Sequence, residues 1–173
     1  MPAGSMPPQS QKSSHYAPKT MITVFWNIHG PLIVEALPSG MTWTVDYFIE
    51  SILSKIVDSE PFQRSQRQKQ KFIVHMDNAP VHTAATVKKM MREHHLHGAP
   101  HPPYSPDLAP SDFYLFGALK SRIKGLEFAD SDEIKEWILE QMQMTSKDEP
   151  RRVFQLWKSR LRACIDIDGY YVE

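Results

Sequence analysis

The stretch HMDNAPVHTA, residues 75–84, places an aspartate directly after a run of strand-forming residues and just before a helical pattern. The preceding KFIV, residues 71–74, favours an extended and largely buried strand. Asn78 and Pro80 end that strand. Asp77 therefore stands at the carboxyl end of a strand, where ligand-handling groups collect in open α/β sheets. A turn-capping role is an equal alternative for Asp77, because Asp-Asn is good turn chemistry.

The composition is that of one soluble globular domain, with 41% hydrophobic and 23% charged residues among 173. Lysine plus arginine balances aspartate plus glutamate at 20 each, so any affinity for nucleic acid must come from local patches. The single Cys164 excludes an internal disulfide and suits a reducing compartment. Neither a membrane-spanning apolar run nor the apolar core of a signal peptide is present, so we expect a soluble intracellular protein with no membrane partner.

Two parts are expected along the chain. Residues 1–19 are rich in proline, serine and glutamine and carry no acid, which predicts a disordered lead-in. Residues 20–173 are expected to fold as an α/β layered structure, because strands alternate with helices after an opening hairpin. The expected strands are 21–26, 32–36, 71–74 and 96–100. The expected helices are 44–57 (with Thr44 as N-cap), 83–94 (opening at Thr83), 111–124, 130–144 and 149–163. Residues 63–70 are expected to form a polar, basic loop.

A second carboxylate of interest lies in the proline-rich stretch HPPYSPDLAPSDFYLF, residues 101–116. Asp112 follows Pro110 and Ser111, a proline-led helix start, and so occupies the first helical turn. Leu115 and Leu119 follow at helical spacing, so Asp112 heads the face that packs on the sheet. The alternative is that Asp112 only favours the helix N-terminus electrostatically.

Two acids from separate elements that converge at one sheet edge form a plausible site for hard divalent cations. Oxygen ligands suit Mg²⁺, which usually takes one or two carboxylates and leaves room for phosphate and water. Two such ions would activate a water or hydroxyl and stabilise the leaving oxygen in phosphodiester cleavage.

These two motifs closely resemble the catalytic domain of mariner-family transposases. HMDNAPVHTA and HPPYSPDLAPSDFYLF match in residue type, and the 34 residues between Asp77 and Asp112 match the family's spacing between its second and third catalytic acids. The blocks MITVFWNIHGPLIVEALPSGMTWTVDYFIE, residues 21–50, and VFQLWKSRLRACIDIDGYYVE, residues 153–173, are also similar. The resemblance covers about residues 18–173.

The resemblance implies a ribonuclease H-like fold, a mixed sheet flanked by helices, that cuts and joins DNA strands. Asp77 and Asp112 would be the second and third catalytic acids and metal ligands, with Mg²⁺ or Mn²⁺ as the cofactor. Asp107 would be structural. Transposon-end DNA would be the partner, and the resemblance also allows a second copy of the chain as partner in a homodimer. The location would be nuclear.

The family's first catalytic acid lies on an earlier strand, upstream of the block that begins at Met21, and its helix-turn-helix modules lie further upstream. Residues 1–34 contain no aspartate or glutamate, the first acid is Glu35, and no substitute is evident. We therefore expect an N-terminally truncated catalytic domain whose sheet lacks its first, central strand. That domain should bind metal weakly and be inactive alone. The alternative is a domesticated remnant without catalysis that binds DNA or a protein partner.

Several smaller signals complete the prediction. Basic residues that could contact DNA phosphate, or lie simply in solvent, are Arg64, Arg67, Lys69, Lys71, Lys120, Arg122 and Lys124. A zinc site at His94, His95, His97 and His101 is disfavoured, because no cysteine is near and the segment spans a helix end and a loop. His75 and His82 flank Asp77, and packing or capping is favoured over a place near the metal.

Overall fold

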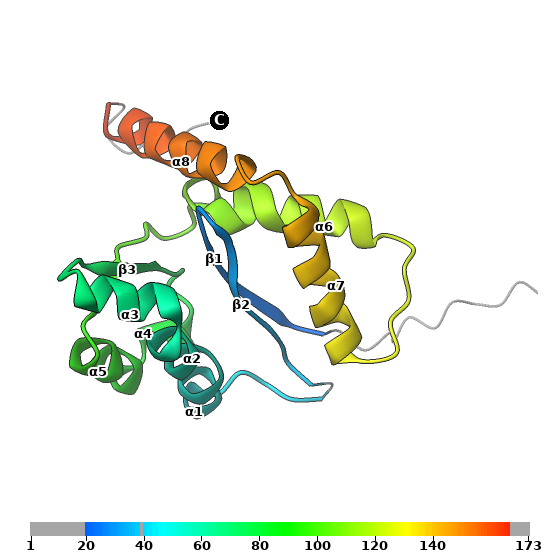
Figure 1. Ribbon diagram of the computed structural model, residues 1–173, viewed down its shortest axis with the longest axis horizontal. Helices are drawn as coiled ribbons and strands as arrows, with labels where there is room; N and C mark the ends of the chain where they lie inside the picture. Colours follow the sequence, from blue (N-terminus) through cyan, green and yellow to red (C-terminus); the bar gives the residue numbers. More distant parts are fainter. Residues whose placement is uncertain (1–19, 39, 167–173) are drawn as a thin grey trace, which may run out of the picture.

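An antiparallel hairpin of β1 (Ile22–Asn27) and β2 (Gly30–Ala36) lies at the centre of the fold (Figure 1). The computed structural model describes residues 20–38 and 40–166, so the predicted disordered lead-in lies outside the described residues. The turn is set locally: Asn27 Oδ1 accepts a hydrogen bond from His29 N at 2.7 Å, and Gly30 has φ 115°, a conformation that only glycine adopts without strain. The predicted hairpin is confirmed.

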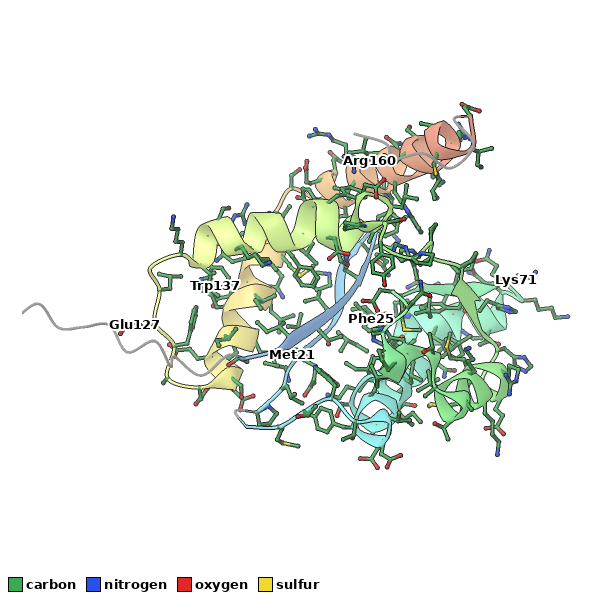
Figure 2. All side chains as sticks on the ribbon, turned by 180° about the vertical axis from the view of Figure 1, so that it is seen from behind. Met21, Phe25, Lys71, Glu127, Trp137 and Arg160 are labelled. Carbon is green, nitrogen blue, oxygen red and sulfur yellow. The ribbon has the colours of Figure 1, made fainter. Side chains whose placement is uncertain are left out.

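The two faces of this hairpin pack against different cores. Val24 and Val34 point toward α6 (Phe116–Ile123) and α7 (Ser131–Met144). Phe25 and Ile33, the residue after Val24 and the residue before Val34, point toward the other helices and β3. Figure 2 shows Phe25 and Trp137 on opposite sides of the hairpin. The alternation of side chains along a strand thus lets one hairpin organise two hydrophobic clusters.

The larger core is built around the helical segment after the hairpin. Thr44 caps it as predicted, its Oγ1 accepting from Tyr47 N at 3.2 Å. The segment runs through α1 (Val45–Phe48), a π-helical turn η1 (Ile49–Leu53) and α2 (Ser54–Asp58). Its buried face presents Phe48, Ile52, Leu53 and Ile56. The predicted helix is confirmed, with a wider turn at its middle.

A second sheet pairs β3 (Phe72–His75) with β4 (Leu96–Ala99) in parallel. The connection includes α5 (Ala85–Glu93), which packs Val87 and Met91 into the larger core. Both strands were predicted. The expectation of a largely buried strand is half right, because Val74 is buried whereas Ile73 is 64% exposed on the opposite face.

The expected mixed sheet is seen only in part, because the described residues form two separate two-stranded sheets, which agrees with the expectation of a sheet without its central strand. Within residues 20–38 and 40–166, β1 pairs with β2, and β3 pairs with β4. Shared hydrophobic packing places the two sheets in one molecule, but among the described residues no backbone ladder joins them.

Two local predictions are wrong. Residues 63–70 were expected to be a loop, but α3 (Glu60–Arg67) occupies most of them. Ser59 caps that helix and a proline lies in its first turn, a start signal that the polar composition obscured. The helix expected from Thr83 begins instead at α5, since Ala84 is extended (ψ 144°) after the short turn α4 (Pro80–Thr83).

The remaining elements follow the predicted order. A short η2 (Pro106–Leu108) leads to the π-helical turn η3 (Ser111–Leu115), which continues into α6. α8 (Glu149–Asp166) follows α7 and crosses the end of the hairpin (Figure 1). Among the described residues, no helix combines the length and apolar character needed to cross a bilayer.

Truncation of Ile52 tests the larger core. Ile52 has no exposed surface, so Ile52→Ala should lower the free energy of unfolding by about 2–5 kcal/mol through lost burial and a cavity. Ile73→Ala is the matched control, because the same atoms are removed from a largely exposed side chain and the expected loss is about 0.5 kcal/mol or less. Urea unfolding measures both, and equal losses would contradict this account of the core.

Candidate active site

Asp77 and Asp112 line one open cleft, although 34 residues separate them in the sequence. The cleft has a volume of about 380 Å³. Its other lining residues come from the turn after β3 and from the proline-rich loop: Asn78, Ala79, His101, Pro103, Tyr104, Ser105 and Pro106. The expected convergence of the two carboxylates is therefore present as one shared cleft, although Asp77 follows a strand of one sheet and Asp112 lies beside a strand of the other.

Asp77 lies two residues beyond the end of β3 and also organises the turn that follows. Its Oδ1 accepts from Ala79 N at 3.1 Å and lies 2.6 Å from His82 Nδ1. Both alternatives for Asp77 thus hold in part, since one oxygen serves the turn while the side chain lines the cleft. The packing role favoured for His82 is incomplete, because its ring also pairs with this carboxylate.

Asp112 lies in the first turn of η3, as the proline-led start predicted. Leu115 and Leu119, which follow Asp112 at helical spacing, are buried in the smaller core, the cluster that Val24 and Val34 form with α6 and α7. Ser111 Oγ accepts a hydrogen bond from Trp26 Nε1 at 3.1 Å, which ties the start of η3 to β1. The hairpin thereby sets where Asp112 enters the cleft.

The electrostatics of the cleft suit a cation. Burial raises the pKa of the Asp112 carboxyl, and the nearby negative charge of Asp77 raises it further. His101 and Lys120 oppose that rise in pKa. Two carboxylates that repel each other in one cleft have the oxygen donors that Mg²⁺ or Mn²⁺ prefers. Within residues 20–38 and 40–166, however, no group of three or more His, Cys, Asp or Glu side chains is arranged to hold a metal.

The histidines divide into two sets. His75 Nε2 lies 3.2 Å from His101 Nδ1, and the His75 ring packs against Trp157 on α8. Burial and the neighbouring His101 lower the pKa of His75 from 6.5 to about 4. His94, His95 and His97 are exposed.

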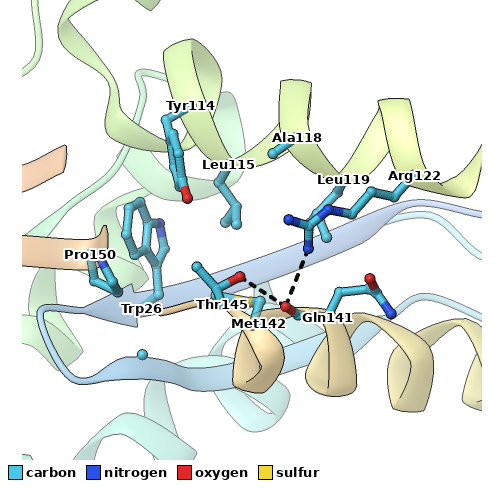
Figure 3. Close-up of a pocket in the computed structure, with 11 residues that line it drawn as sticks. Trp26, Tyr114, Leu115, Ala118, Leu119, Arg122, Gln141, Met142, Thr145 and Pro150 are labelled. Carbon is cyan, nitrogen blue, oxygen red and sulfur yellow. Dashed lines mark hydrogen bonds between the residues drawn. The ribbon is translucent and has the colours of Figure 1, made fainter. Parts of the chain in front are cut away.

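The seven basic residues are not equally free to contact DNA. Arg64 and Arg67 lie on α3 and pair with Glu60 at 2.6 Å and 3.4 Å. Arg122 reaches toward a second, small hollow of about 30 Å³ between α6 and α7, where its Nη1 lies 3.5 Å from the Gln141 carbonyl (Figure 3). Lys69, Lys71, Lys120 and Lys124 are exposed.

Glu35 is the first acid of the chain, and the structure gives it a packing role away from the cleft. It is 9% exposed on β2, with Lys55 at 2.7 Å and Lys135 at 3.7 Å. Asp107 is also buried, and its carbonyl accepts from Arg160 Nη1 at 2.9 Å. Neither acid lines the cleft, which agrees with the structural role expected for Asp107.

A family model described as "DDE superfamily endonuclease" matches residues 2–135. The chain belongs to this family. Mariner Mos1 transposase of Drosophila mauritiana is 28% identical over 164 residues, which are 94% of this chain and 47% of that protein. The chain therefore spans about half the length of this relative.

Solved structures of Mos1 transposase agree with the family assignment. The chain matches the crystal structure of the Mos1 catalytic domain with a TM-score of 0.80 at 28% identity, over 90% of this chain and 77% of that one. It matches the Mos1 paired-end complex with left transposon end with a TM-score of 0.78 at 26% identity, over 100% of this chain and 50% of that one. Structures of the Mos1 catalytic domain with Mg and with Mn are similar at 28% and 29% identity. The mixed α/β fold is thus that of the Mos1 catalytic domain, which is ribonuclease H-like.

Acid should destabilise the fold of this DDE family member through His75. Because the pKa of His75 is about 4 in the folded chain and 6.5 ordinarily, the unfolded chain binds the proton first as the pH falls. The contribution of neutral His75 is fully present above about pH 6.5 and is lost between there and about pH 4. His75→Gln should remove this part of the decline in the free energy of unfolding. Urea titrations across that range measure it, and an unchanged pH dependence in the variant would contradict the assignment.

Proposed function

We propose that the chain is the catalytic part of a transposase that cleaves and transfers DNA strands with the help of divalent metal ions. The observation that carries the proposal is that Asp77 and Asp112 line one cleft, where burial and the negative charge of Asp77 raise the pKa of Asp112. Family membership and the Mos1 structures with Mg, Mn and transposon ends support it.

In this proposal Asp77 and Asp112 hold Mg²⁺ or Mn²⁺. When bound, such ions supply the charge that activates a water or hydroxyl and stabilises the leaving oxygen in phosphodiester chemistry. Asp112 offers its carboxylate from the first turn of a helical segment anchored in the smaller core, and Asp77 offers its own from the turn after β3. The separate anchors fix the distance between the two ligands, to which such catalysis is sensitive.

The 173 residues supply two of the three acids that the mariner resemblance implies. We propose that a further strand between β1 and β3 would complete one mixed sheet and carry the third acid. Within the described residues, the edge of β1 away from β2 and the edge of β3 away from β4 are both unpaired. The 173-residue chain by itself would then be inactive. As a DNA-acting protein it would work in the nucleus, and exclusion of a fluorescent fusion from the nucleus would contradict that location.

Substitution of either cleft acid should weaken metal binding by the chain. Asp77→Asn and Asp112→Asn each remove one charged ligand, so the affinity for Mn²⁺, weak in the parent chain, should fall by at least tenfold, as measured by electron paramagnetic resonance of free Mn²⁺. Asp46→Asn is the matched control, because Asp46 is an exposed acid in the first turn of α1. Equal losses in all three variants would show binding unrelated to the cleft.

An assay of DNA nicking by the same proteins completes this test. The 173-residue chain should show no nicking with Mg²⁺ or Mn²⁺. Robust nicking that Asp77→Ala abolishes would overturn the inactivity and the need for a third acid. Salt-dependent binding of duplex DNA that Asp77→Asn leaves unchanged, without Mn²⁺ binding, would favour the non-catalytic remnant instead.

Lys120 is the basic residue best placed to meet DNA phosphate beside the acids, because it is exposed and its charge lowers the pKa of Asp112. Lys120→Ala should weaken duplex DNA binding evenly across sequences and reduce the salt slope by about 1. Arg64→Ala is the control, since Arg64 is already paired with Glu60 and should change the affinity little. Fluorescence anisotropy at several salt concentrations measures both, and an equal effect of the two variants would contradict this contact.

A further inference from the structure

The two described hydrogen bonds to the Asp77 carboxylate both reach the same oxygen. Oδ1 accepts from Ala79 N at 3.1 Å and lies 2.6 Å from His82 Nδ1. An ionised carboxylate only accepts hydrogen bonds, so Nδ1 must carry the proton in this pair. The Asp77 side chain is 60% exposed and lines the cleft, so its second oxygen is available to a ligand there.

His82 is itself held in place by a backbone hydrogen bond and by a contact with an aromatic ring. It lies on the short turn α4, where its backbone N–H donates to Ala79 O at 2.9 Å. Its ring packs against that of Phe48, with centroids 4.8 Å apart and an interplanar angle of 47°. Phe48 is 1% exposed within the larger core, so the imidazole lies between the buried Phe48 ring and the Asp77 carboxylate.

We propose that His82 is a positioning residue for the Asp77 carboxylate. Its Nδ1–H and the Ala79 N–H together hold Oδ1, which leaves Oδ2 as the metal-binding oxygen in the cleft that Asp77 shares with Asp112. The role rests on the proposed function, because it presumes that a divalent cation binds there. Hydrogen bonds from neighbouring groups orient metal-binding carboxylates, and their loss typically costs about 10–100-fold in metal affinity.

Two substitutions test the N–H donor of His82 and its aromatic ring separately. His82→Phe keeps an aromatic ring against Phe48 and removes the N–H donor. His82→Asn removes the ring but places an amide N–H two bonds from Cβ, where Nδ1 lies in histidine. A purely structural role through Phe48 predicts that asparagine is the more harmful change, whereas a positioning role predicts the reverse for metal affinity.

The first measurement is Mn²⁺ binding by the 173-residue chain and both variants, with urea unfolding to confirm that each is folded. His82→Phe should weaken Mn²⁺ binding by about 10–100-fold, and His82→Asn should stay within about threefold of the parent. Unchanged affinity in His82→Phe would overturn the proposal. So would an equal loss in both folded variants, because asparagine keeps an N–H donor and the loss would then not depend on that donor.

The second measurement is the tautomer of His82, read from its ring ¹⁵N resonances at alkaline pH without metal. The proposal requires the proton on Nδ1, and Asp77→Ala should disturb that resonance. A proton on Nε2 in a chain that binds Mn²⁺ would overturn the role of His82 alone. A parent chain that binds no Mn²⁺ would overturn the metal site of the proposed function and this role with it.

Discussion

Burial of both faces of the β1–β2 hairpin is the constraint on which the rest of the structure depends. Val24 and Val34 hold α6 and α7 on one face, and Phe25 and Ile33 hold the larger core on the other. Asp112 enters with the first of these cores and Asp77 with the second, because η3 continues into α6 and β3 packs its Val74 into the larger cluster. The cleft between the two acids is thus a consequence of packing on a single hairpin.

The charges within the cleft oppose this arrangement. Burial raises the free energy of the ionised Asp112 carboxylate, and the negative charge of Asp77 in the same cleft raises it further. A fold that needed only stability would place a neutral side chain at one of the two positions. Perturbed carboxyl groups that converge in a cleft from separate elements are typical of functional sites, and a bound cation is the simplest relief of their repulsion.

Local and long-range interactions together position the Asp77 carboxylate in the turn after β3. Asp77 Oδ1 and Ala79 N form a local turn of the kind that Asp-Asn sequences favour. His82 reaches the same oxygen only because α4 folds back and Phe48, far earlier in the chain, supports its ring. The Asp77 carboxylate is therefore positioned by contacts within its own motif and by the support that the distant Phe48 gives to His82.

The sequence by itself determined the elements whose signals are local: the hairpin, the capped helix after Thr44, the strand before Asp77, and Asp112 in a proline-led first turn. Strand alternation, helix caps and proline act over a few residues, which is why they can be predicted from the residues alone. Local signals failed at α3, where polar composition obscured the cap at Ser59, and at Ala84, where the helix breaks. The tertiary structure was needed to show that the sheets stay separate, that Arg122 reaches Gln141 on α7, and that Phe48 supports the His82 ring. These features depend on which segments distant in sequence pack together, whereas the Arg64–Glu60 and Asp77–His82 pairs lie within single helical segments or turns and were missed because those local elements were not predicted correctly.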